Sequence, residues 1–194
     1  LPAEIEYYEN GEKQEETWYQ NGLIHREGDL PAEIEYYENG NIREELWYQN
    51  DDIHRDSKSE SGDLPAWILY DENRKISEEK WLKNSEYHRN NDLPAWIYYF
   101  ENGSKKAEAW YQNDKLYRKG DLPSKIIYYE NGKLRRTIWK TGDNIHRDND
   151  LPAGIDYYEN GKKNQEIWFV NNEYYRAVKP AVIVYDENEN KRKE

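Results

Sequence analysis

Four histidines recur at one position of a repeating pattern, and an arginine follows each of them. They are His25, His54, His88 and His146. A row of imidazoles suggests a metal site, but two other units carry Tyr117 and Tyr175 at this position. Tyrosine is not among the usual ligands of zinc. The position is therefore expected to hold a planar ring that packs, with a metal row as the minor alternative and no metal site predicted.

Adjacent carboxylates, such as Glu15-Glu16 and Glu44-Glu45, are frequent. A retaining glycosidase needs two carboxyl groups about 5 Å apart, but pairs repeated along the chain do not single out a site. No unit holds a unique acid, serine or histidine that breaks from the repeat in a way that would build a cleft, and there is neither a cysteine nucleophile nor a phosphate-binding glycine loop. The chain is expected not to be an enzyme, with no catalytic residue and no cofactor.

Two Asn/Asp loops, 90–92 and 148–150, carry oxygen atoms that suit calcium. The same residues are ordinary turn formers, so a turn is the main expectation. The arginine after the histidine position recurs in all six full units. It is expected to order the acidic residue that follows it in its own unit, as Arg89 would order Asp92, by a charge-assisted hydrogen bond.

The element that must position these residues is a repeat. The phrase LPAEIEYYENG occurs at 1–11 and 30–40, and LPAGIDYYENG at 151–161. The alanine position recurs at Ala3, Ala32, Ala66, Ala95, Ser124, Ala153 and Ala181, in steps of 29, 34, 29, 29, 29 and 28 residues. Such a period is typical of stacked supersecondary units. We expect one elongated domain, 1–189, with a charged tail at 190–194. Its units are 1–29, 30–63, 64–92, 93–121, 122–150, 151–178 and the truncated 179–189.

Within one unit, Ala3, Ile5 and Tyr7 lie two residues apart, which predicts a half-buried strand. The following Asn10-Gly11 predicts a two-residue type I′ turn. Counting back across that turn places Trp18 opposite Ala3.

A second turn is predicted at Asn21-Gly22, with less regular versions in the later units. A short third strand then brings His25 opposite Trp18. The fold class is thus an all-β, elongated antiparallel β-meander repeat array, with about three strands in each of six full units. The insertion between Arg55 and Asp63 is expected to be a surface loop.

Composition limits the partners. The chain of 194 residues has a formal net charge of −12, which repels nucleic acid and anionic membrane surfaces. No apolar run approaches the length of a transmembrane helix, so the chain is expected to be soluble. There is no cysteine and no methionine. The compartment stays open, cytoplasmic or at an extracellular or virion surface, and a chain that starts at a repeat boundary without a start residue is expected to be either a processed or a partial product.

The first-strand positions that alternate with the repeated alanine, isoleucine and tyrosine form a variable face, which changes character along the chain. Units one and two place Glu4, Glu6, Glu33 and Glu35 there, whereas units three to five place large apolar groups on this face. These seven residues are the predicted binding patch: Trp67, Leu69, Trp96, Tyr98, Phe100, Ile127 and Tyr129. Contiguous aromatic side chains on a surface typically indicate an interaction site, with Trp67 and Trp96 expected to be adjacent. The alternative is that the sheet itself covers this face.

The phrases YYENG, WYQNG, HR and DLPA resemble the divergent MORN-type repeats of bacteria, phages and large DNA viruses, the MORN-2 or YwqK-like class. The resemblance covers almost the whole chain. It implies stacked all-β hairpins used for scaffolding, membrane-adjacent roles or protein interaction. The step of 29 residues is longer than a MORN unit and the MORN glycine pattern is absent, so lipid binding is not carried over.

The expected function is a non-enzymatic structural or scaffold module that contacts a protein partner, or assembles with itself, through the patch. The runner-up is a carbohydrate- or cell-wall-binding module. Residues 96–103, WIYYFENG, are similar to choline- and glucan-binding wall repeats, which stack sugars on aromatic rings. End-to-end assembly through the terminal strands is a further expectation.

Overall fold

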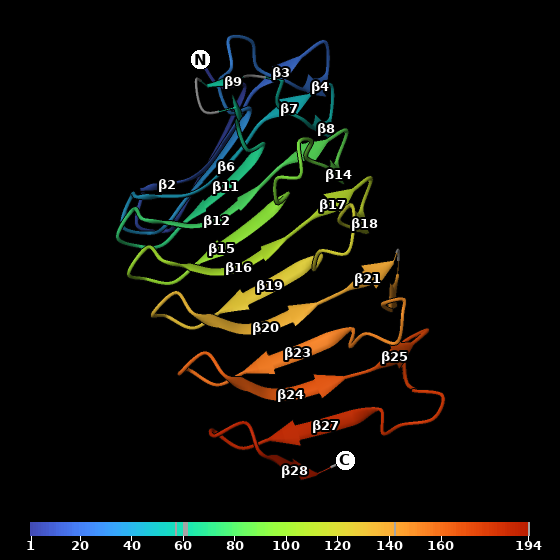
Figure 1. The fold of residues 1–194 in the computed structure, drawn as a ribbon. Helices are drawn as coiled ribbons and strands as arrows, with labels where there is room; N and C mark the ends of the chain where they lie inside the picture. Colours follow the sequence, from blue (N-terminus) through green and yellow to red (C-terminus); the bar gives the residue numbers. More distant parts are fainter. Residues whose placement is uncertain (57, 60–61, 142, 194) are drawn as a thin grey trace.

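The computed structural model describes residues 1–56, 58–59, 62–141 and 143–193. Its main element is one antiparallel sheet of 14 strands, paired in sequence order as a succession of hairpins. Each full unit contributes two strands to this sheet, so the two ends of the chain lie at opposite ends of it (Figure 1). The predicted all-β meander repeat array is therefore confirmed.

Each full unit also forms a separate ladder of two short strands, and these ladders follow one another along one side of the sheet (Figure 1). The sheet strands are β1 (Glu4–Tyr7), β2 (Lys13–Thr17), β5 (Glu33–Tyr36), β6 (Ile42–Leu46), β11 (Trp67–Tyr70), β12 (Ile76–Lys80), β15 (Trp96–Tyr99), β16 (Lys105–Ala109), β19 (Lys125–Tyr128), β20 (Leu134–Ile138), β23 (Gly154–Tyr157), β24 (Lys163–Ile167), β27 (Val182–Tyr185) and β28 (Lys191–Lys193). The ladder strands are β3 (Tyr19–Gln20), β4 (Leu23–Ile24), β7 (Tyr48–Gln49), β8 (Asp52–Ile53), β13 (Leu82–Lys83), β14 (Glu86–Tyr87), β17 (Tyr111–Gln112), β18 (Lys115–Leu116), β21 (Lys140–Thr141), β22 (Asn144–Ile145), β25 (Phe169–Val170) and β26 (Glu173–Tyr174).

A full unit thus has four strands where the sequence predicted about three, because the second predicted strand is divided at its tryptophan. In the first unit, the Trp18 N–H donates to the carbonyl of Ala32, in the next unit, at 2.8 Å. The Trp18 carbonyl accepts the N–H of His25 at 3.0 Å, as the predicted opposition of these two residues requires. The tryptophan therefore joins the main sheet to the short ladder.

The first turn is not the predicted two-residue type I′ turn. The Gly11 N–H donates to the Tyr8 carbonyl at 3.0 Å, and the Tyr8 N–H to the Glu12 carbonyl at 2.9 Å. Gly11 has a φ of 87°, while Asn10 is not among the residues with positive φ. This is the three-residue loop that combines a type I turn with a left-handed glycine. The Asn10 side chain contributes by accepting the Glu12 N–H at 2.9 Å.

A bulge next to this loop restores the predicted register. Tyr7 pairs with Lys13, whereas Glu6 pairs with Glu15, so one extra residue lies on the second strand. The type I′ geometry occurs instead at the second turn, where Asn21 and Gly22 have φ values of 54° and 81°.

The buried core is a thin layer that links neighbouring units. Trp81 forms one cluster with Ala95 and Ile97 of the next unit. The predicted opposition of Trp18 and Ala3 agrees with the pairing of Glu4 with Thr17 in the same hairpin, and the backbone N–H of the tryptophan also pairs forward, with the alanine of the next unit. In the third unit too, the Trp81 N–H donates to the Ala95 carbonyl at 2.8 Å.

The repeated arginine also joins units rather than ordering its own loop. The Arg118 guanidinium lies 3.9 Å from the centre of the Trp110 ring and donates to both carboxylate oxygens of Asp92, in the preceding unit, at 2.9 Å. The indole N–H of Trp110 donates to the Asp92 carbonyl at 3.0 Å. The predicted pairing of each arginine with the next acidic residue is therefore wrong. The same cross-unit ion pair recurs in Arg55–Asp29, Arg89–Asp63, Arg147–Asp121 and Arg176–Asp150.

Two other stretches differ from expectation. Part of the insertion forms a two-stranded ladder, β9 (Lys58–Ser59) with β10 (Gly62–Asp63), instead of a loop; residues 57, 60 and 61 lie outside the described residues. Within the predicted tail, β28 (Lys191–Lys193) pairs with β27 as the last strand of the sheet, and 194 is not described. Residue 142, in the predicted second turn of unit five, is likewise outside the described residues.

Candidate interaction face

The sheet has two faces of different character, because successive side chains of a strand point to opposite sides. The constant face carries the repeated isoleucine and tyrosine of each first strand and the glutamate that pairs opposite the isoleucine, as Glu16 does with Ile5. The variable face carries the positions that alternate with these residues along each strand, beginning with Glu4 and Glu6 in the first unit.

On the constant face, tyrosine hydroxyls bind glutamates of the preceding unit. The Tyr36 hydroxyl donates to Glu16 at 2.5 Å, and the contact recurs as Tyr70–Glu45, Tyr99–Glu79, Tyr128–Glu108 and Tyr185–Glu166. Burial by itself would raise the pKa of Glu16, but hydrogen bonds from Lys13 and Tyr36 outweigh it and hold that pKa below its usual range. This face holds neighbouring units together.

The variable face carries the predicted patch. Assigned by strand alternation, all seven patch residues lie on it, and each is half-buried. Trp67 and Trp96 are not direct neighbours, since Lys80 pairs with both and lies between them. The patch is thus a row of aromatic rings in which the Lys80 ammonium lies between two tryptophans.

Trp67 is fixed by two polar contacts. Its indole N–H donates to Glu44 at 2.8 Å, and the Lys80 ammonium lies 3.3 Å from the centre of its ring. Leu69 continues the face in register between Glu44 and Glu78. A half-buried tryptophan bound on its edge and on its ring has little rotational freedom to lose on binding a partner.

Trp96 is held in a comparable way. Its indole N–H is hydrogen-bonded to Glu78, its ring stacks on Tyr98 with centres 6.1 Å apart, and the Lys125 ammonium lies 5.1 Å from it. Lys106 lies 4.5 Å from the Tyr98 ring and 5.5 Å from the Phe100 ring. Aromatic rings and cations therefore alternate over units three to five.

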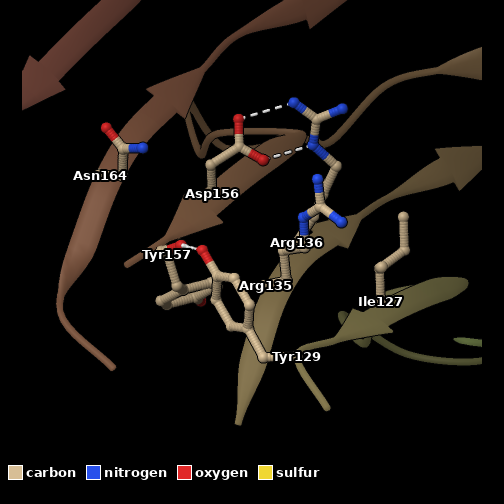
Figure 2. A pocket seen from close by; sticks show the side chains of 7 residues that line it. All are labelled: Ile127, Tyr129, Arg135, Arg136, Asp156, Tyr157 and Asn164. Carbon is tan, nitrogen blue, oxygen red and sulfur yellow. Dashed lines mark hydrogen bonds and ion pairs between the residues drawn. The ribbon is translucent and has the colours of Figure 1, made fainter. Parts of the chain in front are cut away.

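A cavity of about 420 Å³ opens at the junction of units five and six, beside the last two patch residues. It is lined by Ile127, Tyr129, Arg135, Arg136, Asp156, Tyr157 and Asn164. Figure 2 shows the Arg136 guanidinium bound to the Asp156 carboxylate, and the Tyr129 hydroxyl directed at the Tyr157 backbone, whose carbonyl it reaches at 2.8 Å. The Arg135 guanidinium lies 5.9 Å from the Tyr129 ring centre. The cavity offers a planar ring, a cation and an amide.

Each histidine has a polar partner on at least one ring nitrogen, although Nδ1 of His25 and Nδ1 of His146 are buried without a hydrogen-bond partner in the described part of the chain. His88 contacts the side chains of Asn113 at 2.8 Å and Asn90 at 3.2 Å, and His54 accepts the Asn84 N–H at 3.2 Å. Among the described residues, the one group of three side chains close enough to share a cation contains no histidine. It comprises Glu33, Glu35 and Glu44, whose nearest oxygens lie within 4.8 Å of one another.

The predicted carboxylate pairs do not converge. Glu44 binds Trp67 on the variable face, while its neighbour Glu45 binds Tyr70 on the constant face. In the two loops considered for calcium, Asp92 and Asp150 bind the arginines of the following units. These acids are used in joining units.

Two features escaped sequence reasoning. One is the charge division of the variable face, which counting charges at alternate strand positions would have revealed. The other lies in the short ladders, where Asp51 of unit two accepts the Ile24 N–H of unit one at 2.6 Å. Ser85, Asp114 and Asn172 accept the N–H groups of Ile53, Tyr87 and Ile145 in the same way. Turns that look like degraded Asn-Gly sequences therefore supply side chains that join units.

No helix in the described part of the chain is long and apolar enough to cross a membrane. In comparisons with known proteins, no protein-family model matches the chain, and no curated protein matches it.

Proposed function

We propose that this chain is a non-enzymatic repeat module that binds a protein partner through the seven patch residues, and that its repeat is of the MORN type. The observation that carries the proposal is the row of half-buried rings on the variable face, with Lys80, Lys125 and Lys106 placed over them. Tryptophan and tyrosine side chains held in one conformation are common anchors of protein interfaces.

The division of the molecule supports a binding role. The constant face and the short ladders join units, whereas Trp67, Tyr98 and Ile127 stand at positions that hold glutamates in units one and two. The fold therefore does not require large apolar groups there. The histidines and paired acids also have structural partners, which supports a role without catalysis.

The runner-up, carbohydrate binding, is favoured by the cavity beside Tyr129. A tyrosine ring next to Asp156 and Asn164 combines an apolar platform with groups that bind hydroxyls, as sugar sites do. In that case the cavity, rather than the tryptophans, would hold the ligand.

Both candidates can be tested with two probes, a displayed library of random peptides and a glycan array. We expect peptides selected on the wild type to lose binding to the double variant Trp67→Ala/Trp96→Ala. The matched control, Tyr117→Ala/Tyr175→Ala, removes two exposed rings from the short ladders and should bind the peptides as the wild type does.

Circular dichroism would establish that both variants are folded. Peptides that bind both double variants equally would overturn the proposal. Glycans retained by the wild type and lost in Tyr129→Ala, with no peptide selected, would replace it by the carbohydrate function.

A further inference from the structure

Charge is divided along the variable face. In units one and two this face carries six carboxylates against the single cation Arg43: Glu4, Glu6, Glu15, Glu33, Glu35 and Glu44. On units four and five, strand alternation places two cations, Lys125 and Arg136, and no carboxylate on this face. Two more cations, the bulge residues Lys106 and Arg135, lie over the Tyr98 and Tyr129 rings of the patch. One face of an acidic chain therefore has both an acidic end and a cationic, aromatic end.

The acidic end is short of cations. Three of its carboxylates, Glu33, Glu35 and Glu44, crowd within 4.8 Å and are half-buried. Burial, and the nearby charges of Glu15 and Glu44, raise the pKa of Glu33. Positive groups brought to this surface would relieve the repulsion.

The cationic end has the opposite imbalance. Among the described residues, no carboxylate lies within ion-pair distance of Lys106, Lys125 or Arg135; Arg136 alone of the four is paired, with Asp156. Burial and the nearby ammonium of Lys140 lower the pKa of Lys125. The two ends are complementary, and they lie on the same side of one sheet.

We propose that a second copy of this chain docks face to face on the variable face, about a two-fold axis near unit three, so that units one and two of each copy cover units five and four of the other. This rests on the proposed function, because it uses the same patch and names its partner. A two-fold arrangement makes every acidic–cationic contact twice. At the axis, β11 of each copy lies over β12 of the other, which places Trp67 against the Lys80 of the second copy.

The surface is large enough for such a contact. Ten neighbouring strands, β1 to β20 in sheet order, lie in this region. At about 4.8 Å per strand and about 3.3 Å per residue over roughly four residues, they span on the order of 600 Å² in projection. Accessible area exceeds projected area, and a standard interface buries about 800 Å² per partner. Two sheets packed face to face would lie about 10 Å apart.

Sedimentation velocity with two reciprocal charge reversals tests the docking. One variant is Glu4→Lys/Glu6→Lys, in unit one, and the other is Lys125→Glu/Arg135→Glu, in unit five. We expect the wild type to form a dimer that dissociates as salt is raised. Each variant alone should be monomeric, because like charges would meet at both ends. An equal mixture of the two should recover the dimer, because every contact again joins opposite charges.

The control Glu9→Lys/Glu101→Lys changes the same number of charges in exposed hairpin loops and should dimerise like the wild type. A monomeric wild type, variants that still dimerise, or a mixture that stays monomeric would each overturn the docking. If the wild type is monomeric yet peptides still bind in a Trp67- and Trp96-dependent manner, the self-docking fails while the proposed function stands.

Discussion

Tryptophans occur on both faces of this sheet, and they are held in different ways. Trp110 is 6% exposed, lies under the guanidinium of Arg118, and its indole N–H binds a carbonyl of the preceding unit. Trp96, on the variable face, is half-buried, and its indole N–H binds Glu78 in a neighbouring strand. A tryptophan under an arginine recurs in every full unit, whereas a tryptophan on the variable face occurs in two. The comparison teaches that a repeat can reserve one face for stacking and leave the other to vary.

Replacing each tryptophan by alanine should separate the two faces most clearly. We expect Trp110→Ala to lower the free energy of unfolding by about 3–5 kcal/mol, since it removes a buried ring and leaves the Asp92 carbonyl without its donor. Trp96→Ala should cost about 1 kcal/mol, because its ring is partly exposed already. Urea denaturation measures both values. Equal costs would show that the variable face is core, which is the covered-sheet alternative.

Alkaline pH is expected to lower the stability of the protein through the tyrosine hydroxyls of the constant face. Burial first, and then hydrogen bonds to glutamates, raise the pKa of the hydroxyls of Tyr99 and Tyr128. The unfolded value is about 10. Because the folded state keeps these protons more tightly, this stability is fully present below about pH 10 and is lost as the pH rises further.

We therefore expect the urea midpoint to fall above about pH 10, and to fall less in Tyr99→Phe/Tyr128→Phe, which has two fewer such hydroxyls. The test is to measure the urea midpoint of both proteins at a series of pH values across this alkaline range. An identical fall in the two proteins would mean that other groups set the alkaline limit.

Local patterns in the sequence predicted local structure well. The two-residue alternation of Ala3, Ile5 and Tyr7 and the Asn21-Gly22 turn depend on neighbouring residues alone, and the structure has a strand, β1, and a tight turn at those places. Asn10-Gly11 was assigned the wrong turn because the same dipeptide fits both a type I′ turn and a type I turn with a bulge. The bulge that restored the register leaves no sequence signal.

Contacts between units could not be assigned from a periodic sequence. Arg118 has an aspartate three residues after it, Asp121, and another 26 residues before it, Asp92, and Arg89 and Arg147 have aspartates at the same two spacings. Only the stacking of the units decides between them. For the patch, alternation placed all seven residues on one face, but the cations between the rings come from other strands, so the Lys80 contact with Trp67 required the register.

The smallest change in the free energy of unfolding is expected at the position after the repeated tyrosine, just beyond the end of the first strand of each unit. Tyr8, Tyr37, Tyr129 and Tyr158 donate their hydroxyls to a backbone carbonyl of the next unit at 2.6, 2.8, 2.8 and 2.7 Å. Unit four has Phe100 here and lacks this bond. We expect Phe100→Tyr to raise the free energy of unfolding by about 0.5–1.5 kcal/mol, the net value of one hydrogen bond.

The gain should appear in urea denaturation, with Tyr129→Phe as the reciprocal variant that loses a similar amount. If Phe100→Tyr stabilises the fold but weakens peptide binding or dimer formation, the phenylalanine of unit four favours binding at the expense of one hydrogen bond between units. If neither the stability nor the binding changes, the ring at position 100 contributes neither to the contact between units nor to the patch, and Tyr98 is the last patch residue of unit four.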